Sequence, residues 1–261
     1  ALRDVSFVAP QGKITALVGP SGSGKSTLVQ LIAGLLKADK GKIIVDNDDI
    51  IAKKFNKKIL RKKLGIVFQF PEMQLFEQSV EKDIFFGLKQ YNLSYKEKCA
   101  RAKEVLNLLG LDFEEIRDKS PLALSGGEKR KVAIAGVMVC KPKYLIFDEP
   151  IAGLDYSSRE SFMKVLLKLK EQGTSIIIIS HNLDYLAEYA DRIIVMNNGK
   201  IVLDDLPNIV FGKQQMLDEL NIGTCSSKNI INLLKANDIQ MPDNIIKYND
   251  LLNSLITCFG E

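Results

Sequence analysis

The sequence contains few cysteines and histidines, the residues that form disulfide bonds and zinc sites, and it lacks tryptophan. It has no tryptophan, one histidine and four cysteines in 261 residues. The cysteines are scattered without a C-x-x-C pair, which favours free thiols of a reducing cytosol over a disulfide framework or a zinc site. No apolar run approaches the ~20 residues that a membrane-spanning helix needs. The net charge of only +4 neither requires nor excludes a nucleic-acid partner.

The remaining composition is that of a globular protein, with 46% hydrophobic and 26% charged residues. Its length fits one large domain, or one domain with a small appendage. Apolar strands alternate with helical segments, which indicates a parallel sheet with helices on its faces. The predicted strands cover residues 2–7, 14–18, 41–45, 64–68, 144–147 and 175–179, and a hairpin covers 193–196 and 200–203 around Asn198-Gly199.

The middle and the end of the chain have a different pattern. Residues 53–63 are basic and predict a solvated face, and Pro71 predicts a loop. Residues 80–138 have helical periodicity. From residue 212 to 227 the sequence is linker-like, and the two segments that follow, 228–236 and 248–258, are amphipathic. Residues 213–261 therefore predict a small C-terminal appendage.

A glycine-rich loop stands between an apolar strand and a helix. It reads Gly19, Pro20, Ser21, Gly22, Ser23, Gly24, Lys25, Ser26, Thr27. Strand, loop and helix in this order are the context that a P-loop requires. Glycines let backbone N–H groups point at phosphate oxygens, and the helix N-terminus adds positive potential. We expect Lys25 to reach the β- and γ-phosphates and the Ser26 hydroxyl to bind Mg²⁺; the alternative is a Gly/Ser surface turn.

A second apolar strand, 144–147, ends in two carboxylates. Ligand and catalytic groups collect at the carboxyl ends of strands in open α/β sheets. Asp148 is suited to hold Mg²⁺, and Glu149 is suited to polarise an attacking water as general base. An ordinary acidic turn is the alternative, which the P-loop makes less favoured.

The segment Leu124-Ser125-Gly126-Gly127-Glu128 opens a helix and forms a second potential anion-binding terminus. A simple N-cap serine followed by flexible residues would look the same. One chain rarely needs two phosphate-binding termini for one nucleotide. The simplest resolution is that this terminus serves the nucleotide of a second subunit.

With these motifs the chain resembles the ATP-binding cassette ATPase family over its whole length. Walker A is 19–27, the signature is 124–128, and Walker B ends at Asp148 with Glu149 after it. Gln69 fits the Q-loop, the segment 152–155 ending in Asp155 fits the D-loop, and His181 fits the switch histidine. The resemblance implies a dimer in which each ATP lies between one P-loop and the partner's signature.

The resemblance also implies roles for single residues. Ser125, Gly126, Gly127 and Glu128 would contact ATP in trans. Gln69 would sense Mg²⁺ and the membrane partner, His181 would donate a hydrogen bond to the γ-phosphate, and Asp155 would couple the two sites. The implied cofactors are ATP and Mg²⁺.

The implied fold is α/β, with a RecA-like P-loop NTPase core. An antiparallel β subdomain, an inserted α-helical subdomain and a small C-terminal α/β appendage complete it. The domains expected are a cassette at 1–212, with its core at 1–69 and 141–212 and its helical subdomain at about 70–140, and an appendage at 213–261.

Three departures from the family pattern touch no phosphate or metal ligand. Lys129 stands where relatives have arginine or glutamine, and Ile151 where many have threonine. The aromatic residue that stacks on adenine is expected upstream of Ala1, and Phe7 is expected to pack in the core instead.

The segment Gln69 to Phe76 is similar to the Q-loop region of energy-coupling-factor transporter ATPases, importers of vitamins and metal ions, and residues 237–252 are similar to their C-terminal domain. Phe70, Pro71, Leu75 and Phe76 would form a groove for a short helix of an integral membrane partner. The alternative is that they pack as core. The expected location is peripheral, at the cytoplasmic face of the cell membrane, beside a second ATPase, a membrane scaffold and a substrate-binding membrane subunit.

Two rival classes remain. A soluble cassette ATPase acting on DNA or ribosomes usually has long coiled-coil insertions or two cassettes in one chain, and the sequence has neither. A metabolic P-loop kinase would lack the segment 124–128.

Overall fold

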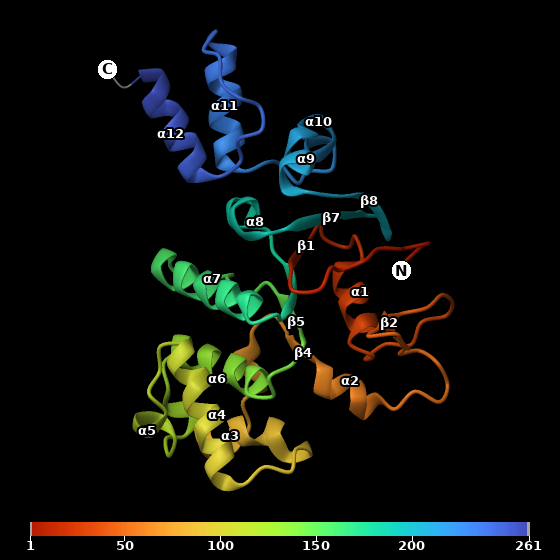
Figure 1. Ribbon diagram of the computed structural model, residues 1–261, viewed down its shortest axis with the longest axis vertical. Helices are drawn as coiled ribbons and strands as arrows, with labels where there is room; N and C mark the ends of the chain where they lie inside the picture. The colour runs from red at the N-terminus through yellow and green to blue at the C-terminus, as the bar shows by residue number, and fades with distance from the viewer. Residues whose placement is uncertain (1, 260–261) are drawn as a thin grey trace. The chain divides into compact units, whose positions relative to one another are not determined.

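The computed structural model describes residues 2–259, which divide into two compact units (Figure 1). Unit 1 consists of Ala1–Val29 with Ile177–Glu261, and unit 2 of Gln30–Ile176. Helix α1 (Lys25–Ile32) and strand β6 (Ser175–Ile179) cross the boundaries between these two stretches of chain.

Unit 1 contains the strand that precedes the P-loop. All five residues of β1 (Ile14–Val18) are buried. β1 pairs in parallel with β7 (Arg192–Asn197), and β7 pairs antiparallel with β8 (Lys200–Asp205). The strand order in this unit is β6-β1-β7-β8. Asn198 and Gly199 join β7 to β8 with φ of 47° and 77°, as a tight hairpin turn of mirror-image type requires, which confirms the predicted hairpin.

The C-terminal part of unit 1 is helical (Figure 1). It contains α8 (Leu183–Tyr189), α9 (Pro207–Gly212), α10 (Gln214–Glu219), α11 (Ser226–Ala236) and α12 (Tyr248–Phe259). The predictions here are partly wrong. Residues 213–259 contain no strand, so the appendage is helical instead of mixed α/β, and α10 lies in the expected linker. The apolar faces of α11 and α12 explain the separate core they share, formed by Ile231, Met241, Ile245 and Leu251.

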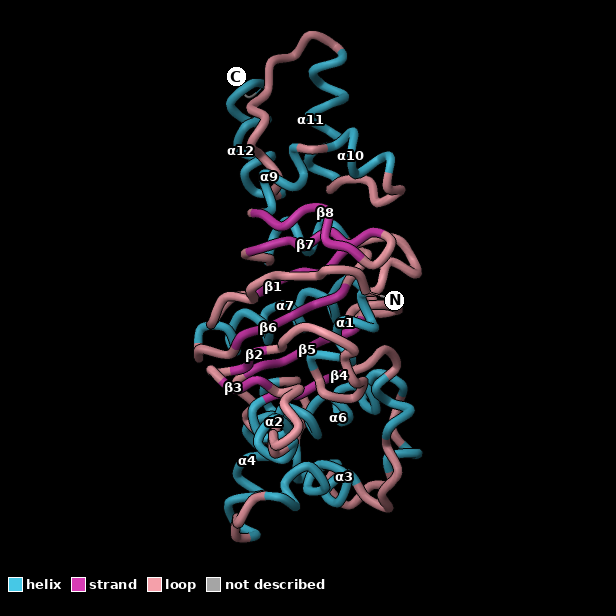
Figure 2. Tube along the Cα trace, turned by 90° about the vertical axis from the view of Figure 1, so that its right-hand side faces the viewer, coloured by secondary structure: helices cyan, strands magenta, loops and turns pink. Residues whose placement is uncertain are grey.

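Unit 2 has its own pair of parallel strands, visible side by side in Figure 2. β4 (Leu64–Val67) and β5 (Tyr144–Asp148) align Leu64 with Tyr144 and Val67 with Phe147. Two-residue strands β2 (Ile44–Val45) and β3 (Asp48–Asp49) form a hairpin, the only antiparallel pair in the part of unit 2 that is described. The expected antiparallel subdomain is thus reduced to this hairpin. The basic segment before β4 becomes α2 (Lys57–Lys63).

The rest of unit 2 is helical, as the periodicity of residues 80–138 predicts. It contains α3 (Val80–Gly87), α4 (Tyr95–Leu108), α5 (Phe113–Ile116), α6 (Gly126–Met138) and α7 (Tyr156–Glu171), with short 3₁₀ helices η1 (Pro71–Gln74), η2 (Leu88–Gln90) and η3 (Pro121–Ala123). Ser94 and Glu97 form a capping box that starts α4. Buried apolar side chains of α3, α4 and α6, such as Ile84, Leu106 and Ile134, form the core of this part.

Further predictions of local structure are wrong. Residues 2–7 form no strand, and Phe7 is only half-buried, so it is not a core residue. The strand expected at 41–45 is limited to Ile44–Val45. Pro71 begins the 3₁₀ helix η1 instead of standing in an irregular loop, because its fixed φ suits the first position of a helical turn.

Candidate functional site

The glycine-rich loop lies between β1 and α1, as the sequence predicts. Gly19, Gly22 and Gly24 have φ of 147°, 78° and 105°, values that side chains with a Cβ rarely adopt. A Cβ at Gly19 would lie 2.1 Å from the carbonyl oxygen of Met196 in β7. Glycine is therefore required at this position both by conformation and by the close approach of a neighbouring strand.

Lys25 is buried at the start of α1, and its ammonium group turns back onto the loop. Nζ donates to the carbonyl oxygens of Gly19 (2.7 Å) and Pro20 (3.0 Å) and to Oγ of Ser23 (3.4 Å). The side chain is thus held within the loop, at the N-terminus of a helix. Positive charge and helix dipole act at the same place, which favours an anion.

His181 belongs to the same unit as the loop. It is exposed and lies two residues beyond the end of β6, the neighbour of β1 in the strand order, and the P-loop directly follows β1. Asn182 caps the helix α8 that follows: its side chain accepts from the N–H of Tyr185 at 3.2 Å, and its own N–H donates to Oγ of Ser180 at 3.1 Å. These hydrogen bonds fix the turn that carries the histidine.

In unit 2 the parallel pairing of β4 and β5 brings three predicted residues to one edge. Gln69 lies two residues beyond β4, Asp148 is the last residue of β5, and Glu149 follows it. The carboxyl ends of paired parallel strands meet at one edge of a sheet. Glu149 has φ of 51°, an uncommon conformation for a residue with a long side chain. Strain of this kind often accompanies function.

Ser125 is the N-cap of α6. Its Oγ accepts from the N–H of Glu128 at 3.3 Å, and the Glu128 carboxylate accepts from the N–H of Ser125 at 2.8 Å. Hydrogen bonds to the Glu128 carboxylate, from the Ser125 side chain and then from the Ser125 backbone N–H, lower the pKa of that carboxyl group. The capping serine considered from the sequence is therefore present.

Capping does not explain the two glycines that follow Ser125. Gly126 and Gly127 are exposed, neither has positive φ, and a Cβ at either would meet no atom within 4 Å. Nothing in the described part of the chain requires glycine at these positions. Their backbone is open to approach from outside the chain.

Asp155 caps α7. Its carboxylate accepts from the N–H of Ser158 at 3.0 Å and from the Ser158 hydroxyl at 2.6 Å, and these bonds lower its pKa. The side chain is exposed. The loop before it is held by Arg159, whose Nε donates to the carbonyl oxygen of Leu154 at 2.7 Å.

The residues predicted to form the membrane-partner groove divide into an exposed and a buried set. Phe70 is 54% and Phe76 63% exposed, whereas Leu75 is half-buried. Pro71 is buried, so it anchors η1 and does not line a surface.

The sequence missed two members of this apolar surface. Met73, in η1, is 83% exposed. Phe86, on α3, packs edge-on against Phe76 with the ring centroids 4.9 Å apart. Helical spacing predicts Phe86 only as a member of a helix, because its contact with Phe76 depends on tertiary packing. We call Phe70, Met73, Phe76 and Phe86 the aromatic patch.

Sequence analysis also missed Arg130. This arginine lies on the buried face of α6 with Ile134 and Met138, and its guanidinium donates to backbone carbonyls after β5. The sequence did contain a signal. Ile134 and Met138, four and eight residues after Arg130, are apolar and lie on the same helix face, so a charged residue in that row is unusual.

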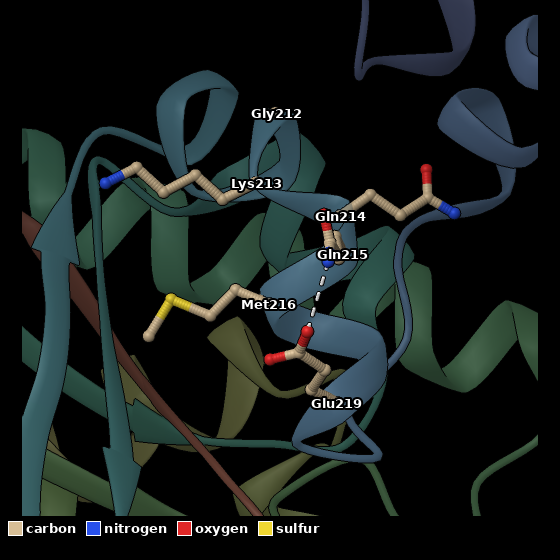
Figure 3. Close-up of a pocket in the computed structure, with 6 residues that line it drawn as sticks. All are labelled: Gly212, Lys213, Gln214, Gln215, Met216 and Glu219. Atoms are coloured by element: carbon tan, nitrogen blue, oxygen red, sulfur yellow. Dashed lines mark hydrogen bonds between the residues drawn. The ribbon is translucent and has the colours of Figure 1, made fainter.

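A cavity of about 430 Å³ lies elsewhere, around the start of α10 (Figure 3). Gly212, Lys213, Gln214, Gln215, Met216 and Glu219 line it. Gln215 donates to Glu219 across one turn at 3.3 Å. None of the predicted site residues lines this cavity.

Three further findings concern cysteines, metals and membrane spans. Cys99, Cys140, Cys225 and Cys258 are free thiols, as predicted. Residues 2–259 contain no cluster of three or more His, Cys, Asp or Glu side chains arranged for a metal ion. Over the same residues, every helix is too short or too polar to cross a bilayer.

Comparisons with known proteins agree with one another. A family model described as ABC transporter matches residues 2–152. The chain is 43% identical over 262 residues to the energy-coupling factor transporter ATP-binding protein EcfA2 of Clostridium tetani, covering 100% of this chain and 91% of that protein. It is 43% identical over 239 residues to the protein of the same name from Enterococcus faecalis, covering 90% and 82%.

Solved structures give the same result. The structure of cbiO1 from Clostridium perfringens, described as part of the ABC transporter complex cbiONQ, matches with a TM-score of 0.75 and 38% identity over 90% of this chain and 92% of that one. A dimeric post-hydrolysis state of the ATP-binding cassette MJ0796 bound to ADP and Pi matches with a TM-score of 0.70 and 28% identity over 79% and 90%.

Proposed function

This chain belongs to the ABC transporter family, and we propose that it is the ATP-hydrolysing subunit of an energy-coupling factor importer for vitamins or metal ions. ABC ATPases couple ATP hydrolysis to transport, and the relatives that cover most of this chain carry the energy-coupling factor name. Its place would be the cytoplasmic face of the cell membrane, bound to membrane subunits.

The phosphates of ATP would bind at the loop of residues 19–27. Lys25 already lies buried against the loop carbonyls, at the N-terminus of α1, so its charge is positioned before the nucleotide arrives. Binding to a positioned charge costs little reorganisation, which strengthens electrostatic stabilisation.

Mg²⁺ would be held by the Ser26 hydroxyl, the Gln69 amide oxygen and the Asp148 carboxylate. These are hard oxygen donors, the type that Mg²⁺ prefers. When bound, the ion would neutralise charge on the β- and γ-phosphate oxygens. Gln69 and Asp148 follow the paired strands β4 and β5, which supports a shared ligand.

Glu149 would act as general base toward the attacking water, and His181 would donate a hydrogen bond to the γ-phosphate. A base must be held in place within hydrogen-bond reach of the proton that it removes. The conformation of Glu149, at φ of 51°, is consistent with such a fixed position.

The observation that carries the proposal is the open backbone at Gly126 and Gly127. A Cβ at either position would meet no atom of the described residues within 4 Å, yet both are glycine at the start of a 13-residue helix. A second cassette, either another copy or a related chain, would present its ATP to this terminus. ATP would then join the two cassettes, and hydrolysis would release them. A ligand that binds the closed dimer far better than the open one drives such a cycle.

The aromatic patch would dock an integral membrane subunit. Exposed aromatic and methionine side chains are typical of a surface that receives an amphipathic helix. Closure of the ATPase dimer would then move the membrane scaffold, and through it the substrate-binding subunit.

The test is the variant Glu149→Gln in the complete transporter complex. It should bind ATP with unchanged affinity and hydrolyse it at least ~100-fold more slowly. Purified with its partner ATPase and without the membrane subunits, it should accumulate an ATP-bound dimer on size-exclusion chromatography. Glu171→Gln, the same change at the exposed end of α7, is the matched control and should behave as wild type. If Glu149→Gln hydrolyses ATP as fast as wild type, Glu149 is not the base. If the amount of dimer is the same with and without ATP, the two chains do not share the ATP pocket.

A further inference from the structure

Arg130 has its guanidinium buried against a single stretch of backbone. The residue is 8% exposed. Its Nη1 donates to the carbonyl oxygen of Ala152 at 2.9 Å, and its Nη2 donates to those of Pro150 at 2.6 Å and Glu149 at 3.1 Å. All of these contacts lie within unit 2.

The three carbonyls belong to four consecutive residues, 149–152, which we call the carbonyl turn. Aligned carbonyl dipoles repel one another unless a cation or a set of donors lies between them, and buried carbonyls that lack a donor are strongly disfavoured. The turn itself has only a long internal hydrogen bond, from the N–H of Ala152 to the carbonyl of Glu149 at 3.3 Å. Arg130 is therefore the principal donor to this turn among the contacts described.

The same turn begins with the strained residue of the site. Glu149 adopts φ of 51°, and such a conformation persists only where the surroundings hold it. The guanidinium contacts the carbonyl of Glu149 and those of two residues after it, so it fixes the backbone on the C-terminal side of the strained angle.

Two effects act on the buried charge of Arg130. Burial lowers the pKa of its guanidinium, and the negative charge of Glu72 in η1 acts in the opposite direction. Oε2 of Glu72 is itself buried and has no hydrogen-bond partner among the described residues. Arginine suits this position because its planar fork can serve several acceptors while it stays ionised, which a lysine cannot reproduce.

We propose that Arg130 is a positioning residue that fixes Glu149 through the carbonyl turn. The proposal rests on the proposed function, in which Glu149 acts on the ATP bound by its own chain and Ser125 faces the ATP bound by the partner. Arg130 and Ser125 lie in the same helix.

The test separates the two pockets with base-inactivated dimers. In the first dimer the partner's equivalent of Glu149 is changed to Gln, so that the remaining hydrolysis depends on Glu149 of this chain. In the second dimer this chain carries Glu149→Gln, so that the remaining hydrolysis occurs in the pocket that uses the Ser125 end of this chain. Arg130→Lys is introduced into this chain in both dimers, and kcat and KM for ATP are measured.

A misplacement of about 1 Å in a catalytic group lowers rates by about 100-fold. We therefore expect Arg130→Lys to lower kcat about 100-fold in the first dimer, with KM within about twofold of its parent. In the second dimer kcat should change less than about threefold. Equal losses in both dimers, a loss confined to the second, or a rise in KM alone would overturn the proposal.

Two controls make the outcome decisive. Arg101→Lys, the same change on α4, should leave both dimers unaltered. Arg101 is half-buried, and its guanidinium lies over the Tyr91 ring at 5.8 Å, away from the carbonyl turn. If Arg130→Lys does not fold, Arg130→Gln, which keeps a donor without a buried charge, replaces it with the same expectations.

The proposal and the proposed function fail in different ways. If Glu149→Gln alone leaves hydrolysis undiminished, the assignment of the base is wrong and both fall. If Glu149→Gln abolishes hydrolysis in its own pocket while Arg130→Lys and Arg130→Gln retain kcat in the first dimer, only the role of Arg130 is refuted.

Discussion

The carboxylate of Asp184 accepts two hydrogen bonds from Ser226, a residue 42 positions further along the chain. The Ser226 N–H donates to Oδ1 at 2.6 Å, and its hydroxyl donates to Oδ2 at 2.9 Å. Asp184 lies in α8, which begins just after His181, and Ser226 is the first residue of α11. The C-terminal appendage is thus attached to the helix that follows His181.

We predict that Asp184→Asn loosens α11. The neutral amide loses the charge-assisted bonds and the favourable position of an anion at a helix N-terminus. A loss of about 1 kcal/mol should make α11 amides exchange with solvent about fivefold faster. Hydrogen-exchange mass spectrometry measures this. Asp250→Asn, on the exposed face of α12, is the control, and unchanged exchange in Asp184→Asn would show that the contact carries no stability.

Gly127→Ala should stabilise the chain and inactivate it. A Cβ there has no neighbouring atom within 4 Å in residues 2–259, and alanine is favoured over glycine in helices by about 0.5–1 kcal/mol. If the partner's ATP approaches this backbone, the added methyl group obstructs it and kcat should fall at least ~10-fold. Gly136→Ala, in the same helix and equally unobstructed, should give the stability gain without the loss of activity. Full activity of Gly127→Ala would contradict the trans contact.

Phe70→Asp with Phe76→Asp should detach the ATPase from its membrane partner while ATP affinity stays unchanged. Two charges in the aromatic patch oppose apolar docking. Aspartate adopts left-handed conformations more readily than most residues, so the φ of 56° at position 70 does not penalise it. Co-purification with the membrane subunits and ATP-driven uptake are the measurements. Ile59→Asp, at an exposed apolar residue of α2, controls for added charge, and an intact complex in the double variant would exclude the patch.

We predict that the ionised Asp46 carboxylate stabilises the folded state at neutral pH and that this stabilisation is lost at acidic pH. Its carboxylate accepts from the Tyr144 hydroxyl at 2.5 Å, pairs with Lys63 at 3.2 Å and contacts Lys143. Lys143 is the largest cause of the lowered pKa of Asp46, followed by Tyr144. A carboxyl group whose pKa is lower in the folded than in the unfolded state stabilises the fold above its unfolded pKa of about 4, and that stability is lost as the pH falls below this value.

The variant Asp46→Asn tests this. At pH 7 it should unfold at a lower urea concentration than wild type. Its free energy of unfolding should be lower by roughly 1–3 kcal/mol, because charge-assisted hydrogen bonds are lost. The difference should shrink progressively between about pH 4 and pH 2. Asp39→Asn, at an exposed residue, should match wild type at every pH. A difference that stays constant down to pH 2 would argue against the ionised carboxylate as its source.

The sequence alone predicts those parts of the candidate site that depend on residues close together in the chain. The order of apolar strand, glycine-rich loop and helix predicts the P-loop around Lys25, and the end of β5 predicts the position of Asp148. Serine and aspartate at helix starts predict caps, and Ser125 is one. These features depend on conformational freedom and hydrogen bonding within a few residues, so they can be inferred from the sequence alone.

Only the tertiary structure decided which distant residues meet. The contact of Arg130 with the carbonyl turn, the packing of Phe76 on Phe86 and the bond from Ser226 to Asp184 join residues that no local pattern pairs. The same limit explains the wrong predictions. Residues 2–7 alternate like a strand, but a strand exists only where a neighbouring strand accepts its hydrogen bonds, and pairing of that kind is decided by the packing of the whole chain.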